Sequence, residues 1–62
     1  MKGSKMNDMY DVTYTAYEKG TNYIVSEGTM PVRTSSAYMA EQTVKSMFSS
    51  TELIIRTVRK VN

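Results

Sequence analysis

Cysteine and histidine are both absent from this chain of 62 residues. Without cysteine the chain can form no disulfide and no thiolate site, and its six scattered acidic residues do not make up a structural zinc site. Most acid–base and covalent catalysis also lacks its usual side chains, because no nucleophile has a plausible base. We therefore expect a protein that is not an enzyme and that uses no metal and no cofactor.

Long apolar runs are missing as well. No segment approaches the roughly 20 apolar residues that a membrane span needs. The basic N-terminal residues have no apolar stretch behind them, so they do not read as a signal peptide. The lack of cysteine agrees with a reducing compartment, and we expect a cytoplasmic location with no membrane and no small-molecule substrate.

The net charge of +2 is too small to indicate a partner by itself. A basic balance favours nucleic acid in general, and the sheet tyrosines with Arg56, Arg59 and Lys60 could stack bases and hold phosphates. Alternatively, Tyr10 and Tyr14 are core residues, and the basic side chains of residues 56–60 are solvated. We favour this second interpretation, which leaves nucleic acid as a minor hypothesis.

Tyrosine, threonine and valine alternate with period two over residues 9–17, which predicts a strand. The segment EKGTN at 18–22 contains a glycine suited to a turn with positive φ, and residues 23–32 complete a hairpin. Gly28 is a candidate for a β-bulge. Pro31 cannot donate to a ladder of hydrogen bonds, so the second strand lies at an edge of the sheet or ends there.

A helix is predicted over residues 35–49. Thr34, Ser35 and Ser36 are candidate N-caps, since each side chain can accept a hydrogen bond from an unpaired backbone N–H. The β-branched residues at 52–61 predict a third strand. The expected core stripe of the helix recurs at helical spacing and consists of Ala37, Ala40, Val44, Met47 and Phe48.

The order of these elements is β-β-α-β, which belongs to the α+β class. The crossover through the helix makes the second and third strands run the same way, and the first strand runs against both. The simplest sheet has the order 2-1-3, is antiparallel throughout and carries the helix on one face. We expect a single domain over residues 9–62, preceded by a flexible arm, residues 1–8.

One helix can cover only one face of this sheet, yet all three strands carry apolar residues on both faces. A bare apolar face marks an interaction surface, and a domain this short has a marginal core that a partner chain can supplement. The third strand would contribute either Ile54 with Val58 or Leu53 with Ile55. The residues that we expect at a homodimer interface are Tyr17, Val25, Ile54 and Val58.

Tyr38 and Met39 lie away from the core stripe on a helical wheel. Tyrosine is enriched at interfaces because its rigid ring buries a large area at low entropic cost. The alternative is an exposed tyrosine that lies over its neighbours. Because Glu41 and Gln42 flank the Tyr38 side, we expect these four residues to form a partner-binding surface.

Several short stretches resemble the small dimeric uracil-DNA glycosylase inhibitors of Bacillus phages, over most of residues 10–61. Other small phage proteins share the β-β-α-β order, including inhibitors of host RNA polymerase. The matching features are Tyr10-Asp11-Val12-Thr13, the glycine turn, a tyrosine that starts the second strand, a serine-led helix with an early aromatic residue, and Glu52-Leu53-Ile54-Ile55 leading to Lys60-Val61.

The resemblance implies a homodimer that imitates DNA and prevents uracil excision by the host enzyme, the first step of base excision repair. That enzyme flips its target base and inserts an apolar side chain into the gap. By the resemblance, paired helices form an apolar groove for this side chain, with acidic groups in place of phosphates. Tyr38 matches the early aromatic residue of the helix, and Glu41 or Glu27 could provide carboxylates. The positive net charge departs from the acidic character of that family.

Overall fold

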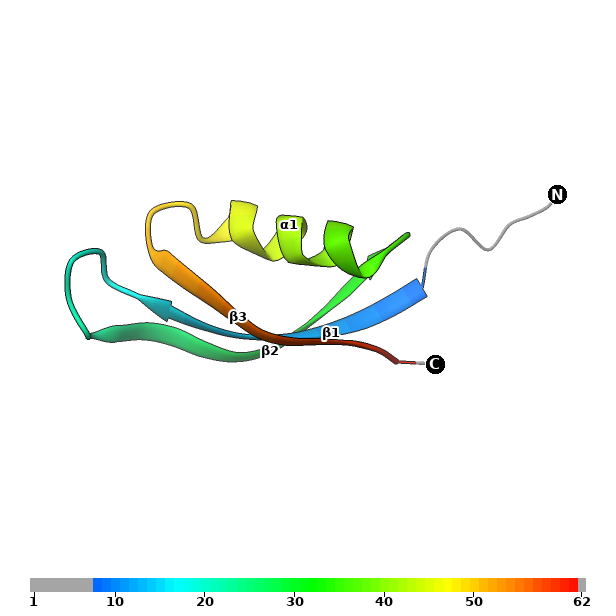
Figure 1. Cartoon of the computed structure of the whole chain (residues 1–62), viewed down its shortest axis with the longest axis horizontal. Coiled ribbons are helices and arrows are strands. Elements are labelled where there is room, and N and C mark those ends of the chain that lie inside the picture. The colour runs from blue at the N-terminus through cyan, green and yellow to red at the C-terminus, as the bar shows by residue number, and fades with distance from the viewer. Residues whose placement is uncertain (1–7, 62) are drawn as a thin grey trace, which may run out of the picture.

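The computed structural model describes residues 8–61, and within them the chain forms three strands and one helix (Figure 1). All three strands are antiparallel to their neighbours, in the order β2-β1-β3. This confirms the predicted β-β-α-β fold with the first strand at the centre. The elements are β1 (Asp8–Tyr17), β2 (Ile24–Thr34), α1 (Ala37–Met47) and β3 (Glu52–Lys60).

The central strand begins one residue earlier than predicted. Asp8 belongs to β1 rather than to the expected arm, and its Oδ2 atom lies 3.4 Å from Nζ of Lys60, at the end of β3. The backbone N–H of Val61 also donates to the carbonyl of Met9 at 2.8 Å. The remainder of the arm, residues 1–7, lies outside the described residues.

The turn between β1 and β2 follows the predicted chemistry. Gly20 has a φ of 80°, a conformation that glycine adopts without steric cost. The Glu18 N–H donates to the Tyr23 carbonyl at 2.9 Å, and the Thr21 hydroxyl donates to the Glu18 carbonyl at 3.1 Å. These hydrogen bonds close the hairpin and hold Tyr23 just before β2, which begins one residue later than predicted.

The prediction of a bulge at Gly28 is wrong. Gly28 lies opposite Tyr14 in a continuous stretch of the β1–β2 register, and the irregularity falls between Ala16 and Tyr17. There Ala16 pairs with Ser26 and Tyr17 pairs with Ile24, so the extra residue is Val25. The inference from Pro31 is confirmed, because β2 is an edge strand.

The helix is shorter at both ends than predicted. Its N-cap is Ser36, whose Oγ accepts the Met39 backbone N–H at 3.2 Å, and its last residue is Met47. Ala40 and Val44 are fully buried against the sheet. Ala37 and Met47, which we expected in the core, are exposed. They lie about one turn from the buried pair, at the two ends of the helix.

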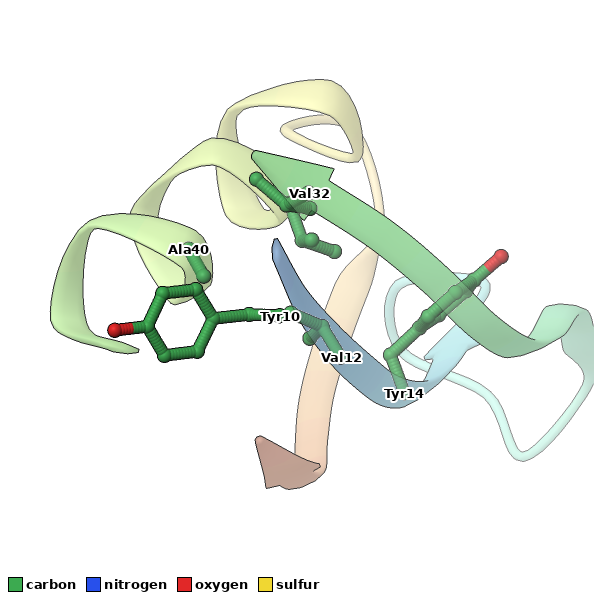
Figure 2. Close-up of a cluster of buried hydrophobic side chains, with 6 residues drawn as sticks. Tyr10, Val12, Tyr14, Val32 and Ala40 are labelled. Atoms are coloured by element: carbon green, nitrogen blue, oxygen red, sulfur yellow. The ribbon is translucent and has the colours of Figure 1, made fainter. Parts of the chain in front are cut away.

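The hydrophobic core fills the space between the helix and one face of the sheet (Figure 2). Val12 on the central strand and Val44 on the helix are its largest fully buried side chains. The ring of Tyr14 packs on Phe48 with centroids 4.9 Å apart. The buried cluster consists of Tyr10, Val12, Tyr14, Val32, Ala40 and Val44.

A one-residue irregularity in β3 decides which of its side chains reach this core. Thr13 pairs with Thr57 and Tyr14 pairs with Ile55, so Arg56 is an extra residue in β3. Directly opposed residues of an antiparallel pair share a face of the sheet. The bulge therefore brings Val58, opposite Val12, to the helix side together with Ile55. The expectation that Val58 lies on the bare face is wrong, because it assumed unbroken alternation.

Candidate partner-binding surfaces

Residues 8–61 contain no detectable pocket and no cluster of three or more acidic residues that could hold a metal ion. Candidate sites in this part of the chain are therefore exposed surfaces. Two of them contain the residues that the sequence singled out: the outer side of α1 and the open face of the sheet, which the helix does not cover.

The outer side of α1 presents two large apolar side chains to solvent. Tyr38 is 67% exposed and Met39 is 45% exposed, as the helical wheel predicted. Glu41 and Gln42 are half-buried beside them. We name these four residues the helix surface. The backbone beneath it is well ordered by local bonds, since Ser36 caps the first turn and the Thr43 hydroxyl donates to the Met39 carbonyl at 2.9 Å.

The fifth predicted binding residue does not join the helix surface. Glu27 lies in β2 opposite Thr15, whereas its neighbour Ser26 lies opposite the buried Ala16. Because side chains alternate along a strand, Glu27 is on the open face, with the sheet between it and the helix. The predicted set is thus split between the two faces of the molecule.

The open face is held together by polar side chains at its centre. The Thr13 and Thr29 hydroxyls are 3.1 Å apart. Arg56 leans across the central strand, where its Nε donates to the Thr15 hydroxyl at 3.3 Å and a terminal nitrogen donates to the Tyr17 hydroxyl at 3.4 Å. Thr15 is only 5% exposed although no helix covers this face. The middle of the open face is therefore a threonine-rich surface rather than an apolar one.

Exposed apolar side chains gather instead at the end of the sheet near the β1–β2 turn. Of the predicted interface residues, Val25 and Ile54 are exposed here and Tyr17 is half-buried. Sequence reasoning missed Tyr23 and Ile24, which are also exposed. The three consecutive apolar residues at 23–25 could have indicated this exposure. Consecutive apolar residues place side chains on both faces of a strand, and both faces are not expected to be covered next to a turn in so small a sheet.

The charges of the described residues balance. The chain has eight basic and six acidic residues, and the only charged residues outside 8–61 are Lys2 and Lys5. These two lysines alone account for the net charge of +2. Residues 8–61 therefore lack the basic excess that a nucleic-acid partner would favour.

Within residues 8–61, no helix has both the length and the apolar character needed to cross a membrane. Comparisons of the chain with models of protein families, with curated proteins and with solved structures find no match. The fold and its surfaces therefore define the class of protein. It is a small α+β protein of the ββαβ type, with exposed apolar side chains on two surfaces outside its hydrophobic core.

Proposed function

We propose that this chain is a homodimeric inhibitor that binds uracil-DNA glycosylase as a DNA mimic, in the cytoplasm of a bacterial host. The observation that carries the proposal is the helix surface. Tyr38 and Met39 are exposed on an ordered helix, and the core of this subunit does not need them. Large apolar side chains on rigid elements are the typical anchors of protein interfaces.

The chemistry of the target supports this choice of partner. A glycosylase of this kind inserts an apolar side chain into the DNA from which it has flipped a base, and its DNA-binding surface is basic because DNA is polyanionic. An inhibitor needs an apolar binding site for that side chain, with carboxylates nearby. Tyr38 provides aromatic area, and Glu41, one turn further along the helix, provides a carboxylate.

The positive net charge is compatible with this function because residues 8–61 carry no net charge of their own. Lys2 and Lys5 are outside the described residues, and residues 8–61 carry equal numbers of acidic and basic side chains. Attraction to a basic groove then depends on local carboxylates rather than on the charge of the whole chain.

A nucleic-acid partner has less support. Tyr10 and Tyr14 are each 8% exposed within the core, so their rings are not free to stack on bases. The Tyr17 hydroxyl is engaged by Arg56. Stacking platforms for single strands need exposed rings beside basic side chains, and of the sheet tyrosines only Tyr23 is largely exposed.

The direct test is uracil excision by purified glycosylase with an equimolar amount of the chain. We expect excision to be blocked, and we expect Tyr38→Ala to weaken inhibition at least tenfold, as the loss of an interface anchor does. Met47→Ala is the matched control, because Met47 is an exposed apolar residue at the far end of the same helix. Undiminished excision with the unaltered chain would refute the proposal, and capture of host RNA polymerase from a lysate would identify the alternative partner.

A further inference from the structure

We infer that Asp8 provides a second carboxylate beside the helix surface, and that Lys60 occupies this carboxylate until the basic surface of a partner displaces it. The inference rests on the proposed function for the identity of that partner. Asp8 is absent from the predicted set of binding residues, because the sequence places it in the N-terminal arm.

A DNA mimic needs more than one carboxylate, because duplex DNA carries one negative charge per about 1.7 Å of its axis. The helix surface has a single carboxylate, that of Glu41. Glu27, the other one expected there, lies on the open face of the sheet. A second carboxylate must therefore come from another residue on the helix side of the sheet.

Strand register excludes most of the other acidic residues. The structure describes all six acidic residues of the chain. Asp11 follows the buried Tyr10 and so points away from the helix. Glu52 pairs with Tyr17 on the open face, and Glu18 lies in the turn between β1 and β2. One acidic residue is left.

Asp8 lies on the helix side of the sheet. It is two residues before Tyr10, whose ring is in the core beneath the helix (Figure 2), and the β1–β2 register is unbroken there. Its partner in β2 is Thr34, two residues before the helix cap Ser36. Asp8 is therefore at the end of the sheet where the helix begins, the same end as Tyr38.

The crossover places Asp8 below the flank of the helix that carries Tyr38. The β2–α1–β3 connection is a right-handed crossover, as such connections almost always are (Figure 1). On a right-handed helix in this position, Tyr38 and Glu41 are on the β3 flank. Lys60 of β3 pairs with Tyr10 and so shares the helix side, and its Nζ atom is 3.4 Å from Oδ2 of Asp8. The Asp8 carboxylate thus points toward the same flank.

The contact between Asp8 and Lys60 is one that a partner can take over. The side chain of Lys60 is 56% exposed and that of Asp8 is 24% exposed, and an ion pair this open to water contributes little to folding stability. Asp8 is fixed in the central strand, whereas a lysine head group moves on a flexible stem. A cation of the partner can therefore replace Lys60 while the carboxylate stays in place, and such a preorganised group loses little freedom on binding.

The two members of this ion pair should affect binding in opposite directions. Loss of the Asp8 carboxylate removes an attraction to a basic partner. Loss of the Lys60 charge frees the carboxylate and removes a cation that repels the same partner. A purely structural ion pair behaves differently, because loss of either member breaks the same contact. The sign of the Lys60 effect therefore separates the two roles.

Inhibition of purified uracil-DNA glycosylase by variants of the full chain tests this role. At physiological salt we expect Asp8→Asn to weaken inhibition about tenfold and Lys60→Gln to strengthen it about threefold. Asp11→Asn and Arg59→Gln are the matched controls, because these two residues pair directly on the same strands and face away from the helix. Each control should change inhibition less than about twofold, since charges a Debye length away are largely screened.

Titration of the unaltered chain with a hexa-arginine peptide, followed by amide NMR, tests the same charge chemistry without the enzyme and without a variant that could fail to fold. We expect the peptide to shift the Asp8 amide resonance more than that of Asp11. A larger shift at Asp11, or weaker inhibition by Lys60→Gln, would overturn the inference. Peptide binding at Asp8 by a chain that does not inhibit the enzyme refutes the proposed function alone. An inhibitor that is weakened by both Asp8→Asn and Lys60→Gln refutes the inference alone.

Discussion

Tyr14 makes both an apolar and a polar contact in this small core. Its ring packs on Phe48 at 4.9 Å, its hydroxyl lies 3.3 Å from the Ser26 hydroxyl, and Gly28 lies opposite it in β2. Gly28 has no side chain that could cover the Tyr14 ring from β2. The Tyr14 hydroxyl reaches Ser26, two residues before Gly28 in the same strand. The residue combines apolar burial with a polar group that has a partner, as buried tyrosines usually do.

We predict that Tyr14→Ala leaves the chain largely unfolded, whereas Tyr14→Phe costs less than about 1 kcal/mol. Truncating a buried aromatic residue costs about 3–5 kcal/mol, and a chain of this length has about 3–9 kcal/mol of stability in total. Losing the hydroxyl removes a single long hydrogen bond. Urea unfolding followed by circular dichroism measures both. If Phe proved as disruptive as Ala, the hydroxyl and not the ring would be the important group.

At the scale of elements, the structure selects one of the three predicted N-cap residues of the helix. Three adjacent residues, Thr34 to Ser36, could each cap the helix by their chemistry, and only the extended backbone of Ser36, with φ −157° and ψ 162°, places its Oγ on the Met39 N–H. The choice depends on where β2 ends, which is set by pairing with β1 through Thr34 and Asp8. Local sequence does not contain that information.

We predict that Ser36→Ala lowers the free energy of unfolding by about 1 kcal/mol, the usual cost of losing an N-cap. Ser35→Ala is the matched control, because Ser35 is exposed and lies one residue before the cap. It should change stability by less than about 0.5 kcal/mol. Thermal and urea unfolding of the two variants compare them directly, and equal losses would show that the cap assignment is wrong.

The bulge in β3 explains why strand alternation predicted the fold correctly but did not predict which β3 side chains lie on each face of the sheet. Hydrophobic patterning predicted the three strands and their order, since those depend on periodicity and chain direction. It placed Ile54 and Val58 on one face, because they are four residues apart. The extra Arg56 breaks that rule, and no residue type in β3 marks a bulge as glycine often does. The error is one residue long, yet it moves Val58 from the bare face to the core.

We predict that deleting Arg56 destabilises the chain far more than replacing it. Without the extra residue, either Val58 or the pair Leu53 and Ile55 must leave the core face, since a one-residue slip turns every side chain over. Each such side chain contributes about 1.5–3 kcal/mol when buried. Arg56→Ala, the control, loses only two polar contacts and should cost about 1 kcal/mol. A deletion variant as stable as Arg56→Ala would show that the bulge is dispensable.

At the scale of the whole molecule, the sequence predicted some residues of the candidate site correctly and grouped others wrongly. The exposure of Tyr38 and Met39 followed from the helical wheel alone. The grouping of Glu27 with them did not hold, because Glu27 is separated from the helix by the sheet. Whether two surfaces meet depends on strand register and, for a dimer, on how the copies are arranged. Those are long-range properties that no local pattern specifies.

At the scale of the whole molecule, the stability of the protein should depend on its concentration. Among residues 8–61, only seven hydrophobic residues are buried while eight large hydrophobic side chains are exposed, so association should add substantially to stability. If folding and dimerisation are coupled, a tenfold rise in protein concentration should stabilise the dimer by about 1.4 kcal/mol. The melting midpoint should therefore rise with concentration in scanning calorimetry. A midpoint unchanged between 5 µM and 500 µM — roughly two tenfold steps — would mean that the subunit folds alone and that its exposed apolar side chains serve the target rather than a second copy.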